Sequence, residues 1–155
     1  MARVLVTGMS GTGKSTLLGE LARRGHRVVD TDYDGWTRPD GDWDEPRMAA
    51  LLATHSDVVV SGTVANQGRF YDRFEHVVLL SAPLDVILHR VRERTANEPA
   101  GNERPGNPYG KSPSDQAEIA RHVVEVEPLL RRGATVELDA RRPTDELADL
   151  VERLA

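Results

Sequence analysis

Short apolar segments rich in β-branched residues alternate along the chain with segments whose apolar residues recur at helical spacing. The first kind predicts strands at residues 3–7, 26–30, 57–61, 76–80 and 134–138. The second kind predicts helices over residues 15–24, from 46 through 52, from 83 to about 95, from 114 onward and from 143 or 144. Alternating strands and helices favour parallel pairing, so we expect an α/β fold whose sheet is covered on both faces and binds ligands at its carboxyl edge.

Two features qualify this pattern in the second half of the chain. The helix from Ser114 carries Pro128, which should bend it, and its apolar positions are Ile119, Val123, Val124 and Leu130. The sequence at residues 97–113 is dense in Pro, Gly and Asn, which excludes regular structure there, and we expect a lid over about residues 95–113. Such a segment inside a compact domain is often a lid, with a plain surface loop as the alternative.

An octapeptide after the first predicted strand, GMSGTGKS at residues 8–15, is a full match to the Walker A pattern G-x-x-x-x-G-K-S/T. Strand, loop and helix follow in the order that phosphate binding needs, because glycines allow close backbone approach and the helix N-terminus adds positive charge. We expect Lys14 to reach the outer phosphates and Ser15 to ligand Mg²⁺. The residues expected to contact the nucleotide are Gly8, Ser10, Gly11, Thr12, Gly13, Lys14, Ser15 and Thr16.

A run of acidic residues follows the second predicted strand. The sequence DTDYDG at residues 30–35 opens like a calcium-binding EF-hand loop, but the twelfth position, which needs a bidentate Glu, is Gly41. At a strand end beside the phosphate loop, Asp30 could instead orient magnesium, and Asp32 could accept a proton from an attacking hydroxyl. Solvated turn carboxylates are the alternative.

Arginines and aromatic residues supply further candidates. Arg90 and Arg94 lie four apart on one helix face and could clamp a transferring phosphate, as could Arg104; a solvated helix face is the alternative. Tyr33 and Trp36 follow the acidic strand end and could stack on a flat substrate. The same holds for the neighbouring tryptophan at position 43, although a core role is as favourable for either tryptophan.

Composition narrows the class of protein. At 155 residues and 39% hydrophobic, the chain suits a single domain over residues 1–155. It contains no cysteine, and no opening segment resembles a signal peptide or membrane helix, so we expect a cytoplasmic protein without a membrane partner. The net charge of −5 disfavours nucleic acid as the main ligand. We expect a monomer or a homodimer.

These motifs together resemble the shikimate kinase and nucleoside-monophosphate kinase branch of P-loop kinases. The resemblance rests on residues 8–15, on VVDTD at 28–32, on the strand ending at Gly62, and on EPLLRRGAT leading into LDARRP at 127–143. It spans essentially the whole chain. It implies a three-layer P-loop NTPase fold with a five-stranded parallel sheet in the order 2-3-1-4-5, a lid, and the use of ATP and Mg²⁺.

The resemblance also implies roles for individual residues. Asp30 would lie near magnesium and Asp32 would contact the acceptor hydroxyl, while a lid arginine would come from the stretch between Arg94 and Arg104. Gly62 would form part of the substrate wall. In the same loop we expect Thr63 and Asn66 to face the substrate. The loop from 140 to 143 would border adenine, through Arg141, Arg142 and Pro143.

Departures from the family pattern limit the substrate. Where shikimate kinases have three consecutive glycines, this chain has Ser61, Gly62 and Thr63, and Val126 replaces an arginine that binds the shikimate carboxylate. We therefore expect an ATP- and Mg²⁺-dependent phosphotransferase that acts on a hydroxyl or phosphate of a small metabolite, with nucleoside-like or nucleotide-like substrates favoured. A regulatory nucleotide-binding ATPase without a small-molecule acceptor is the alternative, and shikimate kinase is a lesser one.

Overall fold

The computed structural model describes residues 2–9, 12–97 and 113–154, and it has the predicted topology. Five parallel strands pair in the order β2-β3-β1-β4-β5. They are β1 (Arg3–Gly8), β2 (Val28–Asp30), β3 (Val58–Ser61), β4 (His76–Ser81) and β5 (Val136–Asp139). The expected α/β class and strand order are therefore confirmed.

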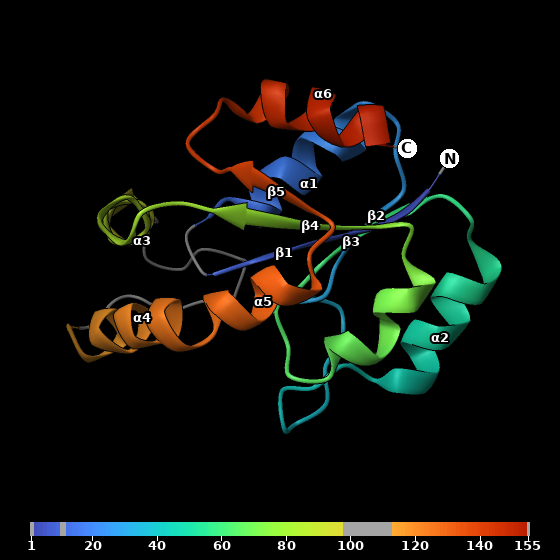
Figure 1. The fold of residues 1–155 in the computed structure, drawn as a ribbon, viewed down its shortest axis with the longest axis horizontal. Coiled ribbons are helices and arrows are strands. Elements are labelled where there is room, and N and C mark those ends of the chain that lie inside the picture. The colour runs from blue at the N-terminus through green and yellow to red at the C-terminus, as the bar shows by residue number, and fades with distance from the viewer. Residues whose placement is uncertain (1, 10–11, 98–112, 155) are drawn as a thin grey trace.

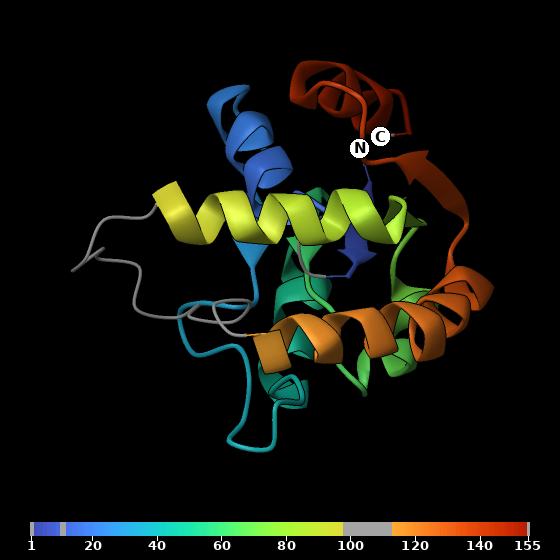
Figure 2. The same cartoon turned by 90° about the vertical axis from the view of Figure 1, so that its left-hand side faces the viewer.

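Helices cover both faces of the sheet (Figure 1). The elements are α1 (Lys14–Arg23), α2 (Glu45–Thr54), the 3₁₀ helix η1 (Gln67–Arg73), α3 (Leu84–Asn97), α4 (Pro113–Glu125), α5 (Glu127–Gly133) and α6 (Thr144–Leu154). Helices α1 and α6 lie together on one face, while α2, α4 and α5 lie on the other. Helix α3 runs alongside α4 beyond the carboxyl end of β4 (Figure 2).

The alternation of side chains along β1 explains why helices are needed on both faces. Val4 and Val6 belong to the apolar cluster beneath α1 and α6, whereas Leu5 belongs to the cluster beneath α2 and η1. All three side chains are at most 1% exposed. Because successive side chains of a strand point to opposite faces, an apolar run such as this one requires cover on both sides.

The predicted long helix from Ser114 is instead two helices, α4 and α5, separated at Val126. Pro128 lies in the first turn of α5 rather than at a bend, because it has no N–H to continue the ladder of the preceding helix. Ile119 and Leu130 are buried as expected. Val124 is 72% exposed, so its assignment to the buried face was wrong.

Candidate active site

The phosphate loop joins β1 to α1 at the carboxyl edge of the sheet. Gly8 has a φ of +155°, and a Cβ there would lie 2.5 Å from the carbonyl oxygen of Leu80, so only glycine fits against β4. Gly13 has a φ of +92° and caps α1 in the left-handed conformation. Both glycines thus serve the backbone path that a Walker A loop needs.

The side chains of Thr12 and Lys14 form hydrogen bonds to backbone carbonyl oxygens at the start of the loop. Thr12 is buried, and its hydroxyl donates to the carbonyl oxygen of Met9 at 2.8 Å. Lys14 donates from Nζ to the carbonyl oxygens of Gly8 and Met9, at 2.8 and 3.2 Å. Its ammonium group therefore lies over the start of the loop. Thr16 is exposed on the first turn of α1. The predicted contacts of Ser10 and Gly11 fall outside the described residues.

Ser15 and Asp30 meet beside the phosphate loop. The hydroxyl Oγ of Ser15 donates to Oδ2 of Asp30 at 2.6 Å, although the residues come from different elements. The other carboxylate oxygen, Oδ1, accepts from the backbone N–H of Asp32 at 3.2 Å, which holds the carboxylate in a turn after β2. Hydroxyl and carboxylate oxygens are ligands that Mg²⁺ prefers. The two residues predicted to bind the metal are thus adjacent.

The loop after β2 forms the next part of this edge. Asp32 is exposed and Tyr33 is half-buried. Among the described residues, no group of three or more His, Cys, Asp and Glu side chains is arranged to hold a metal ion. The turn places Asp34 and Gly35 at positive φ, of 64° and 76°.

Arg47, which the sequence did not single out, fixes this loop. Its Nη1 donates to the carbonyl oxygens of Asp34 and Gly35 at 2.8 and 2.9 Å. Its guanidinium carbon lies 4.0 Å from the centroid of the half-buried Trp36 ring. A cation stacked on an aromatic ring gains electrostatic energy from the ring quadrupole. The residue thereby ties α2 to the predicted acceptor loop, and no local sequence motif marks it.

Trp43 belongs to the core rather than to a stacking surface. Its side chain is 0% exposed, and its indole Nε1 donates to Oγ1 of Thr31 at 3.0 Å. Gly62 packs against both, because a Cβ there would lie 2.3 Å from that Thr31 oxygen. The alternative of a core role is therefore the correct one for Trp43, and Gly62 is needed for packing.

The loop after β3 contains two more predicted substrate residues. Asn66 is 9% exposed, and its amide bonds both the N–H and the carbonyl oxygen of Trp43, as well as Glu45. These contacts hold the chain before α2 in place, and they occupy both the oxygen and the nitrogen of the Asn66 amide. Thr63 is half-buried and lies against Gly8, where its hydroxyl contacts the backbone of the phosphate loop.

Arg90 reaches the phosphate loop from α3. Its Nη2 donates to the carbonyl oxygen of Ala140 at 2.6 Å, and its Nη1 to that of Thr12 at 3.4 Å. The residue thus bridges the phosphate loop and the loop after β5. The side chain of Arg94 and the whole of Arg104 lie outside the described residues, as does most of the predicted lid.

The loop predicted to border adenine follows β5. Arg141 donates from Nη2 to Asp139 at 2.9 Å, and this ion pair lowers the pKa of the Asp139 carboxyl to about 2. Arg142 pairs with Glu146 at the start of α6. Both arginines and Pro143 are exposed. The side chain of Arg90 connects this loop to the phosphate loop, while Arg141 and Arg142 pair with nearby carboxylates.

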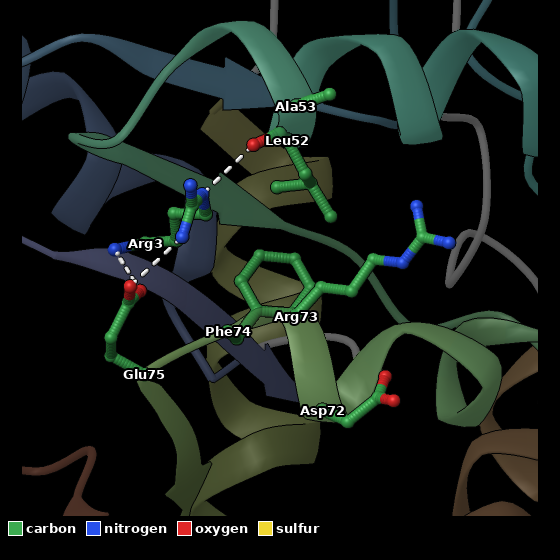
Figure 3. Close-up of a pocket in the computed structure, with 7 residues that line it drawn as sticks. All are labelled: Arg3, Leu52, Ala53, Asp72, Arg73, Phe74 and Glu75. Carbon is green, nitrogen blue, oxygen red and sulfur yellow. Dashed lines mark hydrogen bonds and ion pairs between the residues drawn. The ribbon is translucent and has the colours of Figure 1, made fainter.

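A separate hollow of about 410 Å³ lies at the amino ends of the strands (Figure 3). Arg3 spans it, donating to Glu75 and to the carbonyl oxygen of Leu52. Arg73 and Asp72 extend along its other side. Since the phosphate loop lies at the carboxyl ends, this hollow is outside the candidate site.

The comparisons with known proteins agree with this geometry. A sequence model described as an AAA domain matches residues 4–119. The chain belongs to this AAA domain family. A relative of this AAA domain is HPr kinase/phosphorylase of Xanthomonas campestris pv. campestris (strain B100), 32% identical over 128 residues. That match covers 82% of this chain and only 37% of the relative.

Solved structures share the fold. The AAA domain matches shikimate kinase from Acinetobacter baumannii in complex with shikimate with a TM-score of 0.69 and 19% identity, over 99% of this chain and 92% of that one. Deoxyadenosine kinase from M. mycoides with bound dATP matches with a TM-score of 0.62 and 11% identity, over 97% of each chain. The chain therefore has the fold of P-loop small-molecule kinases. In the part of the chain that the structure describes, none of the helices combines the length and apolarity needed to span a membrane.

Proposed function

We propose that this chain is a phosphotransferase that moves the γ-phosphoryl group of ATP to a hydroxyl or phosphate group of a small metabolite, with Mg²⁺ as cofactor. The observation that carries the proposal is the 2.6 Å hydrogen bond between Ser15 Oγ and Asp30 Oδ2. It brings two oxygen ligands together beside a Walker A loop, with the exposed Asp32 two residues further on.

Each of these residues has a distinct task in the proposal. Ser15 and Asp30 would hold Mg²⁺, which offsets negative charge on the phosphates when bound. Lys14 would transfer its hydrogen bonds from the backbone carbonyls to the outer phosphates of the nucleotide. The backbone N–H groups of the loop would bind phosphate oxygens, because they precede the N-terminus of α1.

The transfer step needs a base when the acceptor is a hydroxyl. The hydroxyl oxygen attacks the γ-phosphorus, the bond from this phosphorus to the β–γ bridging oxygen breaks, and ADP leaves. Asp32 accepts the hydroxyl proton. When the acceptor is a phosphate, its oxygen is already ionised and no such proton transfer is needed. Asp32 would then only orient the acceptor.

The arginines divide between positioning and charge stabilisation. Arg90 is engaged with the carbonyl oxygens of Thr12 and Ala140, so we assign it to holding the two nucleotide-facing loops together. A clamp on the transferring phosphate stays a prediction for Arg94 and Arg104. Arg141, Arg142 and Pro143 would border the base of the nucleotide.

The acceptor class rests on the loop around Tyr33 and Trp36. Two half-buried aromatic rings near Asp32 suit a flat nucleoside-like or nucleotide-like acceptor. A second candidate is a protein hydroxyl, which the 32% identity to HPr kinase/phosphorylase favours. Shikimate remains a third test compound, because a shikimate kinase shares the fold.

The direct test measures ADP release from ATP and Mg²⁺ in the presence of separate pools of nucleosides, nucleotides, sugar alcohols and shikimate, and of HPr protein. Lys14→Ala serves as the blank, because it removes the ammonium group expected to bind the phosphates. Acceleration by one pool supports the kinase and gives its substrate class. Slow release that no pool accelerates favours the regulatory ATPase instead.

A further inference from the structure

We propose that Thr63 is a positioning residue that holds the entry of the phosphate loop in its nucleotide-binding conformation. The inference rests on the nucleotide-binding role of this loop under the proposed function. The hydroxyl Oγ1 of Thr63 donates to the carbonyl oxygen of Gly8 and accepts from the N–H of the same residue at 3.3 Å. One side chain thus satisfies both backbone groups of the first residue of the Walker A loop.

The orientation of this hydroxyl is set by a chain of hydrogen bonds that begins at Gln67. The Oε1 of Gln67 accepts from the N–H of Val64 at 3.0 Å, so the other end of the amide must be the NH₂ group. That group donates to Oγ1 of Thr7 at 3.1 Å. The Thr7 hydroxyl lies 3.2 Å from that of Thr63. Because Thr7 accepts from Gln67 and Thr63 donates to Gly8, the proton between the two hydroxyls comes from Thr7.

The chain is anchored away from the phosphate loop. The second N–H of the Gln67 amide donates to the hydroxyl of Tyr71 at 2.8 Å. A Cβ on Gly133 would start 2.2 Å from the ring of Tyr71, so this glycine lets the end of α5 pack directly on the ring. Thr7 and Gln67 are 0% and 2% exposed. Buried hydrogen bonds of this kind lack competition from water, which favours a single arrangement of the loop.

The carbonyl oxygen of Gly8 connects this series of hydrogen bonds to Lys14. It accepts from Thr63 and, at 2.8 Å, from Nζ of Lys14. When Lys14 turns to the phosphates of a bound nucleotide, Thr63 keeps this buried carbonyl satisfied. Loss of the Thr63 hydroxyl would leave the carbonyl without a partner in the bound state, so nucleotide binding would carry the cost of an unsatisfied buried group.

A substrate contact and a positioning role predict different results for Thr63. If its hydroxyl bound the acceptor, its removal would raise the KM for the acceptor and leave nucleotide affinity unchanged. If it holds Gly8, removal weakens nucleotide binding itself. We expect Thr63→Val to raise the Kd for Mg²⁺-ADP about tenfold in a calorimetric titration. Thr63→Ser, which retains the hydroxyl, should stay within about twofold of the wild type.

Thr135, which immediately precedes β5, provides a control for Thr63. The hydroxyl of Thr135 accepts from the N–H of Val77 at 2.8 Å and donates to its carbonyl oxygen at 3.2 Å, as the hydroxyl of Thr63 does with Gly8. The Val77 carbonyl also accepts from the backbone N–H of Thr135 at 2.8 Å, so it keeps a partner when the hydroxyl is removed. Thr135→Val therefore removes a comparable hydroxyl–backbone contact outside the phosphate loop, and it should leave the Kd for Mg²⁺-ADP unchanged.

Two further measurements complete the test. Gln67→Leu should raise the Kd for Mg²⁺-ADP in the same direction as Thr63→Val, because the Thr7 hydroxyl loses its donor. In the nucleotide-free protein, hydrogen exchange at the Gly8 amide should be about tenfold faster in Thr63→Val and unchanged in Thr135→Val. Neither measurement needs turnover, so they are independent of whether any acceptor is phosphorylated.

The outcomes separate the alternatives. Wild-type affinity for Mg²⁺-ADP in Thr63→Val, or equal weakening by Thr135→Val, overturns the positioning role. Failure of Thr63→Ser to restore binding does so as well, because it moves the cause from the hydroxyl to the packing of the methyl group. Normal affinity in Gln67→Leu overturns the part of the proposal that extends beyond Thr63.

Discussion

The hydroxyl of Ser15 and the carboxylate of Asp30 are joined by a 2.6 Å hydrogen bond that links the first turn of α1 to the end of β2. The residues are fifteen positions apart, and the strand order β2-β3-β1, in which all three strands end at the same edge of the sheet, brings them together. A hydroxyl beside a carboxylate, next to a loop that offers backbone N–H groups, is suited to a metal–phosphate complex.

Asp30→Asn should therefore weaken nucleotide binding only when Mg²⁺ is present. An amide carries no charge, so the variant loses the attraction for the cation while its shape is kept. We expect the Kd for ADP to rise about tenfold with Mg²⁺ and to stay unchanged with EDTA. Asp34→Asn is the matched control, because Asp34 has a φ of 64° and asparagine tolerates this conformation well. Equal weakening in the presence of EDTA would remove the metal role of Asp30.

Asp32→Asn should separate chemistry from binding. If Asp32 accepts the proton of the acceptor hydroxyl, the amide cannot replace it, and kcat should fall by about a hundredfold or more. The Kd for Mg²⁺-ADP should remain that of the wild type, since the hydrogen bond from Asp32 to the carboxylate of Asp30 comes from the backbone N–H, which the substitution keeps. Titration calorimetry and steady-state rates measure the two quantities. A parallel loss of both would assign Asp32 to the metal site.

Arg47 should control the acceptor loop without touching the nucleotide. Arg47→Ala removes the hydrogen bonds to the carbonyl oxygens of Asp34 and Gly35 and the cation over Trp36. We expect the KM for the acceptor to rise about fivefold to tenfold and the KM for ATP to stay constant. Arg47→Lys keeps the charge but lacks the planar fork, so it should recover only part of the effect. A change confined to the KM for ATP would contradict this assignment.

Asp139 should make folding stability depend on acid pH. Arg141 lowers the pKa of its carboxyl from the usual 3.8 to about 2 in the folded chain. Between these values the unfolded chain binds more protons, so the contribution is complete above about pH 4 and is lost as the pH falls towards 2. The difference in urea midpoint between the wild type and Asp139→Asn should therefore shrink from pH 6 to pH 2.5. A difference that stays constant with pH would contradict the ion pair.

The sequence predicted those parts of the site that depend on local spacing. The Walker A pattern requires a fixed order of strand, loop and helix, and Asp30 ends a strand that an apolar run identifies. The proximity of Asp30 to the Walker A loop follows once the strand order is known. Parallel strands expose their carboxyl ends at one edge, so this geometry needed no detail of side-chain packing.

The remaining parts depend on tertiary contacts that no local pattern encodes. Trp36 and Trp43 lie seven positions apart in the same polar loop, yet one is half-buried at the site and the other is fully buried in the core. Trp43 lies in the core because its indole donates to Thr31 and its ring packs on Phe70, and both of these residues are remote from it in sequence. The same holds for Arg47, whose partners are backbone carbonyls.

A phosphotransferase must deliver the γ-phosphoryl group of ATP to an acceptor, so the fate of this group distinguishes it from a regulatory ATPase. The chain would be incubated with γ-³²P-labelled ATP, Mg²⁺ and the pool that accelerates ADP release most, with Lys14→Ala alongside. We predict that the label appears in a new phosphorylated product, that this product is absent with Lys14→Ala, and that it forms in step with ADP. Label recovered only as inorganic phosphate, with every pool, would contradict a phosphotransferase.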